Sequence, residues 1–279
     1  MVKNHISYSE FRNWKICPYY RYLTYEKRVN LFEGNIYTAF GKALHEVCEK
    51  SLTKPENFSG IKDIQDSFKK HFRQELINLP EDEQTKAKKE NLSEWVESAL
   101  KIIPEIYVAL KEKFGDDFKI KKNVLAAEEV LMEPAGKYND RNMKFKGFID
   151  LVAADDTSGK VCIIDWKSCS WGWNSRKKSD TLVAQQLVLY KHFYCQKHNI
   201  DPSNVETYFV LLKRAAKDGN RVEFVRVTAG KKRIENALND LNKALHNITI
   251  GNHVKNKLHC TSCKHRPGSC EFYKTEHCT

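Results

Sequence analysis

Five apolar segments of strand length in the middle of the chain constrain the fold more than any other feature. They lie at 123–132, 143–153, 160–166, 206–213 and 221–227. Each alternates with period two or is continuously apolar, as in half-buried or fully buried strands. A helix-spaced apolar pattern at 181–198 separates the third strand from the fourth. This order predicts an α/β fold with a mixed central β-sheet flanked by helices, rather than a sandwich.

Helical patterns fill most of the remaining chain. Ser7 and Glu10 form an S-x-x-E capping box, which predicts a short helix that starts near Tyr8 and stops at Pro18. Helix-spaced apolar residues also recur at about 39–51, 61–79, 92–114 and 234–245. Pro104 is expected to kink or split the helix that contains it. The charged run between the second and third of these segments is expected to be a solvated linker or helix face.

The second and third strands are expected to form an antiparallel hairpin around a polar turn. If the hairpin is symmetric about the bond between Thr157 and Ser158, Asp150 lies directly opposite Asp165. Opposed residues in a strand pair have Cβ atoms about 5 Å apart. Both aspartates emerge from apolar strands, where an unpaired charge is costly. The pair therefore predicts a divalent cation between them.

The chemistry expected at this hairpin is phosphodiester hydrolysis. Ligands that are all oxygen suit Mg²⁺ or Mn²⁺. Lys167 follows Asp165 by two residues, so it projects from the same face and can reach phosphate oxygens or an attacking water. An Asp-x-Lys sequence alone is more often a surface ion pair, but the apolar residues around Asp165 argue against that reading here.

Several short motifs, taken in order, resemble the PD-(D/E)XK nuclease superfamily in its RecB-like and CRISPR-associated exonuclease branch. These motifs are Ser9-x-Phe11 before Cys17-Pro18-x-Tyr20, Gly41-x-x-x-His45, Glu128 after an apolar stretch, Gly147-x-x-Asp150, Asp165-x-Lys167 and Gln186-Leu187-x-Leu189-Tyr190. No single motif is specific, but their order over about 150 residues is. Asp165 stands where the family often has Glu.

The resemblance implies a restriction-endonuclease-like core and a set of site residues. The metal ligands implied are His45, Glu128, Asp150 and Asp165. The catalytic residues implied are Asp150, Asp165, Lys167 and Glu128, with Gln186 and Tyr190 completing the site. Glu129 competes with Glu128 because adjacent strand residues face opposite sides. His45 has the alternative of packing in its helix or pairing with Glu49, and Gln186 and Tyr190 have the alternative of core packing.

The C-terminal segment carries a cysteine pattern typical of zinc or iron–sulfur sites. Cys260-x2-Cys263-x6-Cys270 supplies three ligands. Cys17 is similar to the lone N-terminal cysteine that some family members combine with three C-terminal ones around a [4Fe–4S] cluster, although the last gap is six residues rather than five. The alternatives are Cys278 as fourth ligand, or a Zn²⁺ site that uses His259, His265 or His277. The remaining cysteines, Cys48, Cys162, Cys169 and Cys195, are expected to pack as small apolar residues.

Four segments follow from these assignments. Residues 1–52 hold the N-terminal helices with Cys17 and His45, and residues 53–118 are a helical insertion. Residues 119–250 form the nuclease core, and residues 251–279 carry the cysteine cluster.

Charge and composition narrow the partner and the compartment. Lys and Arg (47) exceed Asp and Glu (36), for a net charge of +11, which favours a polyanion such as DNA. A mean hydropathy of −0.61 leaves no stretch of about 20 apolar residues, so no membrane partner is expected. The N-terminus lacks the apolar run of a secretory signal, and nine cysteines then suggest a reducing, cytoplasmic location.

The function expected is a Mg²⁺- or Mn²⁺-dependent deoxyribonuclease, an exonuclease on single-stranded DNA ends, in DNA repair, recombination or phage or CRISPR-type DNA processing. Two alternatives belong to other classes. The chain could be a non-catalytic nucleic-acid-binding protein with an iron–sulfur or zinc site, or a structural adaptor in a repair complex.

Overall fold

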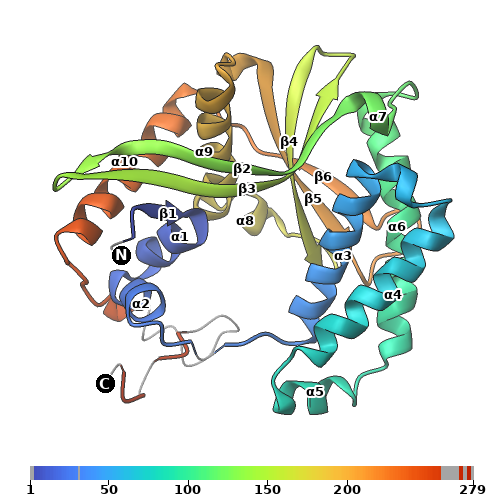
Figure 1. The fold of residues 1–279 in the computed structure, drawn as a ribbon, viewed down its shortest axis with the longest axis horizontal. Coiled ribbons are helices and arrows are strands. Elements are labelled where there is room, and N and C mark those ends of the chain that lie inside the picture. The colour runs from blue at the N-terminus through green and yellow to red at the C-terminus, as the bar shows by residue number, and fades with distance from the viewer. Residues whose placement is uncertain (1–2, 31, 259–269, 273–274, 278–279) are drawn as a thin grey trace. The chain divides into compact units, whose positions relative to one another are not determined.

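A computed structural model describes residues 3–30, 32–258, 270–272 and 275–277 (Figure 1). Cys260, Cys263, Cys278, His259 and His265 lie outside the described residues. The chain forms two compact units. The first unit contains Met1–Glu33, Leu131–Gly147 and Lys231–Thr279, and the second contains Gly34–Val130 and Phe148–Gly230. Each unit is described separately below.

The second unit is a β-sheet with helices packed on it. Its strands are β3 (Arg141–Asp155, from Phe148 on), β4 (Lys160–Cys169), β5 (Val205–Lys213) and β6 (Val222–Arg226), together with the first half of β2 (Val124–Tyr138), which pairs with β3. Its helices are α3 (Ile36–Thr53), α4 (Ile61–Ile77), α5 (Glu81–Ala87), α6 (Leu92–Phe114), α7 (Ile120–Asn123), α8 (Ser175–Lys178) and α9 (Thr181–His198). Two short 3₁₀ turns, Pro55–Asn57 and Pro202–Asn204, complete it.

The sheet is mixed, which confirms the predicted fold class. The strand order is β3-β4-β5-β6. β3 pairs with β4 antiparallel, β4 with β5 parallel, and β5 with β6 antiparallel. The parallel pair requires a crossover connection, and α9 supplies it. Figure 1 shows β4, β5 and β6 between α9 on one side and α3 and α6 on the other.

The hairpin of β3 and β4 has the predicted register. Leu151 pairs with Ile164, and Asp155 pairs with Lys160, next to the turn. The Asp155 carboxylate accepts hydrogen bonds from the backbone N–H groups of Thr157 and Ser158, which shapes the turn. The paired stretch ends at Leu151 and Ile164, and Asp150 and Asp165 are the next residues on the two strands.

The helices between residues 53 and 118 share one hydrophobic core with α3 and the sheet. The rings of Phe40 on α3, Phe68 and Phe72 on α4, and Trp95 on α6 pack together, with ring centroids 5.5–5.9 Å apart. The same core includes Trp166 of β4. Burial of these rings therefore holds the helix that carries His45 against the sheet.

In two helical segments the structure decides between the alternatives that the sequence left open. α6 continues through Pro104 without being split. The charged run at 81–90 contains a helix, α5, because its apolar side is used: Ala87 is buried, and the Gln84 amide donates to the carbonyl groups of Ile77 and Leu79.

The first unit contains β1 (His5–Ser7), α1 (Tyr8–Ile16), α2 (Pro18–Arg21), a π-helical turn (Tyr22–Glu26) and α10 (Lys231–Thr249). β1 pairs in parallel with the first part of β3. Ser7 caps α1 by accepting a hydrogen bond from the Glu10 N–H, as predicted. The Glu10 side chain does not close the box, however. It is buried and forms ion pairs with Arg21 and Lys3, because a buried carboxylate is stabilised more by a cation than by one N–H group.

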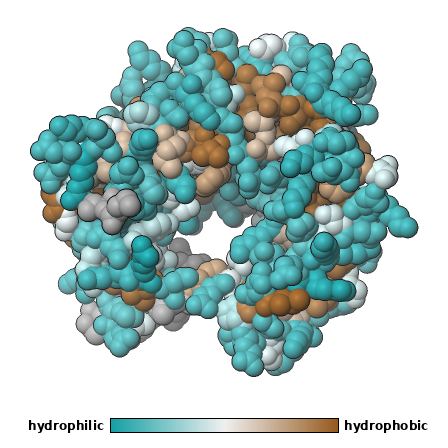
Figure 2. Space-filling view, viewed as in Figure 1, coloured by the Kyte–Doolittle hydropathy of each residue, from teal (hydrophilic) through white to brown (hydrophobic). Residues whose placement is uncertain are grey.

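The surface visible in Figure 2 is mainly hydrophilic, with scattered apolar patches. Across the described ranges, no helix is long and apolar enough to cross a membrane.

Candidate active site

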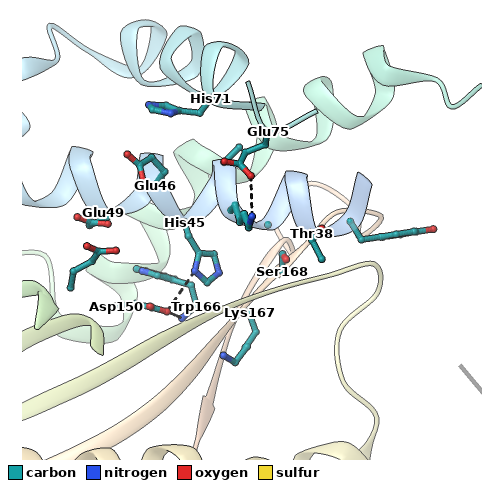
Figure 3. Close-up of a pocket in the computed structure, with 15 residues that line it drawn as sticks. Thr38, His45, Glu46, Glu49, His71, Glu75, Asp150, Trp166, Lys167 and Ser168 are labelled. Atoms are coloured by element: carbon teal, nitrogen blue, oxygen red, sulfur yellow. Dashed lines mark hydrogen bonds and ion pairs between the residues drawn. The ribbon is translucent and has the colours of Figure 1, made fainter. Parts of the chain in front are cut away.

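A cavity of about 820 Å³ in the second unit is lined by four of the predicted site residues, His45, Glu128, Asp150 and Lys167 (Figure 3). Its walls come from α3, α4 and β2, from Asp150 in the interior of β3, and from the end of β4 that lies away from the turn. The titratable residues that line it are Lys42, His45, Glu46, Glu49, His71, Glu75, Glu128, Asp150 and Lys167. The hairpin therefore borders a cavity into which several charged side chains converge.

Asp150 and Asp165 are both held in place by hydrogen bonds. The Asp150 Oδ2 atom accepts from the Trp166 backbone N–H at 2.7 Å, and Asp165 is 2% exposed. Burial raises the pKa of each carboxyl group to about 6. The nearby Glu128 charge adds to the rise at Asp150 and the Asp150 charge adds to the rise at Asp165, while the Lys167 ammonium lowers both pKa values in part. The site thus concentrates negative charge that a cation would stabilise.

Lys167 and Gln186 both contact Asp165. The Lys167 Nζ atom forms an ion pair with Asp165 Oδ2, and one third of its side chain is exposed to the cavity. The Gln186 amide on α9 donates to Asp165 Oδ1 at 2.6 Å. Tyr190, one turn later on α9, is buried, and its hydroxyl oxygen accepts a hydrogen bond of 3.4 Å from the Gln186 amide nitrogen. A hydrogen-bonded series thus runs from Tyr190 through Gln186 to Asp165.

His45 projects from α3 toward the hairpin (Figure 3). Its Nδ1 atom lies 3.7 Å from Asp150 Oδ2. Burial lowers the pKa of His45 to about 4, although a third of the side chain remains exposed, so the ring is neutral at pH 7. A neutral imidazole can donate its nitrogen lone pair to a metal. A close approach of α3 to β4 sets this position, because a Cβ atom on Gly41 would lie only 2.7 Å from the Ser168 hydroxyl.

β2 directs Glu128 and Glu129 to different surroundings. Glu128 lines the cavity, whereas Glu129 forms ion pairs with Lys197 and His198 at the end of α9. Glu128 has a φ of +47°, a left-handed conformation that is rare for a residue in a strand. This local kink turns the Glu128 side chain into the cavity.

Glu49 is a cavity residue that the sequence motifs did not include among the site residues. It follows His45 by one helical turn, and its carboxyl group is hydrogen-bonded to that of Glu128. Burial, with Glu128 and Glu46 nearby, raises the pKa of Glu49. The i, i+4 spacing from His45 is the one signal that could have found it.

The chemistry of these donors fits a hard divalent cation. The buried carboxylate of Asp165, the partly buried carboxylate of Asp150, a neutral imidazole and Glu128 offer oxygen and nitrogen ligands that Mg²⁺ or Mn²⁺ accepts. Within the described part of the chain, no group of three or more His, Cys, Asp and Glu side chains is already arranged to hold a metal ion. Asp165 is engaged by Lys167 and Gln186 instead, so binding would require these side chains to adjust.

The cysteines divide between the two units. Cys48, Cys162 and Cys195 are buried in the second unit and Cys169 is partly buried, as predicted for small apolar residues. Cys17 and Cys270 are buried in the first unit. The backbone N–H of Asn256 donates to the Cys17 sulfur at 3.3 Å, so the segment just before Cys260 lies against Cys17.

Comparisons with known proteins identify the fold and the family of this chain. In fold, the chain is similar to a crystal structure of the protein named "Putative exonuclease" from Eubacterium rectale, with a TM-score of 0.53 and 11% sequence identity. The match covers 95% of this chain and 90% of that chain, and at such low identity it concerns the fold alone. No curated protein matches. The family model of the PD-(D/E)XK nuclease superfamily matches residues 5–270, nearly the whole length, and the protein therefore belongs to the PD-(D/E)XK nuclease superfamily.

Proposed function

We propose that this protein is a Mg²⁺- or Mn²⁺-dependent deoxyribonuclease that acts as an exonuclease on single-stranded DNA ends, in DNA repair, recombination or phage or CRISPR-type DNA processing. The observation that carries the proposal is the grouping of Asp150 and Lys167 in one cavity, with Asp165 buried next to them and paired with Lys167. The net charge of +11 favours a polyanionic substrate, and the fold neighbour named as an exonuclease supports action at ends.

Each residue has a distinct role in this proposal. His45, Glu128, Asp150 and Asp165 would hold the cation, which supplies Lewis acidity and charge neutralisation at the scissile phosphate. The Lys167 ammonium binds the phosphate oxygens or orients the attacking water, where negative charge develops. The Gln186 amide keeps Asp165 oriented, and Tyr190 supports Gln186.

Metal binding should depend on pH because protons compete for the same carboxylates. Asp150 and Asp165 hold protons in the folded protein up to about pH 6, whereas the unfolded chain releases them near pH 4. Their contribution to stability therefore falls as the pH rises from about 4 to 6. His45 contributes with the opposite sign, because only the unfolded chain takes up its proton in this range.

Thermal denaturation of the wild type and of Asp150→Asn separates the effect of the carboxyl group on stability from the effect of metal binding. In EDTA, the variant should be more stable than the wild type at pH 7.5 and indistinguishable from it near pH 4. Added Mg²⁺ or Mn²⁺ should raise the melting temperature of the wild type at pH 7.5 and raise it less at pH 5. The same ions should not raise the melting temperature of the variant. An equal Mg²⁺ effect on both proteins would place the cation elsewhere, and cleavage that persists in excess EDTA would contradict the metal requirement.

We further propose that Cys17, Cys260, Cys263 and Cys270 bind a [4Fe–4S] cluster. Two features of the first unit support this: Cys17 and Cys270 are both buried there, and residues 254–256 contact the segment around Cys17 through hydrogen bonds of 2.8–3.3 Å. An N–H donor to the Cys17 sulfur also suits a thiolate ligand. A cluster of this kind would join the two ends of the chain.

Anaerobic purification tests the cluster directly. The protein should be brown, with broad visible absorption, and Cys17→Ser should bleach it and lower the melting temperature, because a group bound only by the folded state adds its binding free energy to folding. Cys195→Ser, a buried cysteine of the other unit, and Cys278→Ser should both keep the colour. A colourless protein with stoichiometric zinc would replace the iron–sulfur proposal. Bleaching by Cys278→Ser but not by Cys17→Ser would restrict the site to the C-terminal segment.

A further inference from the structure

A tryptophan next to the catalytic hairpin is unusually exposed. Trp171 is 77% exposed, the highest value for any aromatic side chain among the described residues. It follows β4, the strand that carries Asp165 and Lys167, and no sequence motif accounted for it. Tryptophan presents a large apolar face, and leaving it in water forgoes the free energy of burial.

The backbone around Trp171 is held firmly to the sheet. The carbonyl groups of Cys169 and Ser170 accept hydrogen bonds of 2.8 Å from the N–H groups of Arg214 and Ala215, which follow β5. The two residues before Trp171 are thus hydrogen-bonded to the segment that follows β5. The exposure of Trp171 is therefore a feature of the fold.

A chain of ring contacts connects this segment to the catalytic lysine. Trp173 is 9% exposed and packs on Phe209 of β5, with ring centroids 5.1 Å apart. The Lys167 Nζ atom lies 5.6 Å from the centroid of the same Phe209 ring. Phe209 thus lies between Lys167 and Trp173, and Trp173 anchors the segment that displays Trp171.

Positive charge accompanies the exposed indole. The next residues form α8, a single helical turn that contains Arg176, Lys177 and Lys178. Lys177 lies over the Trp173 ring, with Nζ 4.7 Å from the centroid, and Lys178 pairs with Glu223. Arg176 is exposed. Proteins that bind single-stranded nucleic acids commonly combine exposed aromatic rings, on which bases stack, with cations that pair with the phosphates.

We propose that Trp171, with Arg176 and Lys177, forms a subsite that stacks one base of a single-stranded DNA substrate close to the scissile phosphate. This inference rests on the proposed nuclease function and adds a binding contact outside the metal site. Trp171 is four residues from Lys167, so their Cα atoms are at most about 14 Å apart. The stacked base is therefore expected within a few nucleotides of the cleaved bond.

Equilibrium binding in a background that cannot cleave tests this subsite. The probe is a fluorescent oligothymidylate, measured by anisotropy with Asp165→Ala protein. Adding Trp171→Ala should weaken binding by about 5-fold to 150-fold, corresponding to about 1–3 kcal/mol. Trp171→Phe should restore most of the affinity because it keeps a ring. Val108→Ala, which removes an exposed apolar side chain from α6, is the matched control and should have no effect.

An abasic scan distinguishes stacking from a general loss of structure. Each oligonucleotide in the scan lacks one base at a different position. The affinity should fall most when the missing base is at one position near the cleaved bond, and Trp171→Ala should abolish that dependence on position. The proposal is overturned if Trp171→Ala binds as tightly as its background, or if the abasic profile is the same with and without the indole. Because no cleavage is measured, this result is independent of whether the wild type proves to be an active nuclease.

Discussion

Lys167→Ala is expected to lower the rate of DNA cleavage by about 10²–10³-fold or more, while DNA binding stays within a few-fold of wild type. In the proposed mechanism the ammonium group stabilises the charge that develops on the phosphate, and the loss of one such group typically has this effect. Other basic residues still hold the DNA backbone. Gel assays on end-labelled single-stranded DNA measure the rate, and anisotropy measures binding.

Lys160→Ala is the matched control for this experiment. Lys160 lies on the same strand, beside the hairpin turn, and pairs with Glu206 rather than with a cavity residue. We expect cleavage by this variant to remain near wild type. Asp165→Ala should be as inactive as Lys167→Ala. Wild-type turnover by Lys167→Ala or Asp165→Ala would show that the hairpin is not the active site.

Phe68→Ala should give the largest loss of stability, about 3–5 kcal/mol in the free energy of unfolding. Phe68 on α4 is fully buried, and its ring contacts Phe40 of α3 and Phe72 of α4. Removing it leaves a cavity in the core that holds α3, and therefore His45, against the sheet. Urea denaturation followed by circular dichroism measures the effect.

Ile77→Ala on the same helix is the control, because Ile77 is 60% exposed. It should change stability by less than about 0.5 kcal/mol. If Phe68→Ala were equally mild, the helices at 53–118 would not share a core with the sheet. A loss of cleavage by folded Phe68→Ala protein, measured well below its melting temperature, would show that α3 must be held rigidly for activity.

The sequence alone determined the elements whose causes are local. Turn residues between β3 and β4 set the hairpin register, and hence the positions of Asp150 and Asp165 as the next residues beyond the Leu151–Ile164 pair. Apolar periodicity located α9 at the residues where it is observed. In both cases neighbouring residues supply the stabilising contacts, so their order along the chain contains the information.

Only the tertiary structure decided between side chains whose partners are distant in sequence. Glu128 and Glu129 are equivalent by spacing, and the choice depends on the kink at Glu128 and on cations at the end of α9 that bind Glu129. Glu49 resembles any charged residue of an exposed helix until α3 packs beside β2. Likewise, the carboxylate of Glu10 was available for the helix cap and is instead taken by Arg21. Competition between charged partners is settled by which of them burial brings together, and a single sequence does not specify that packing.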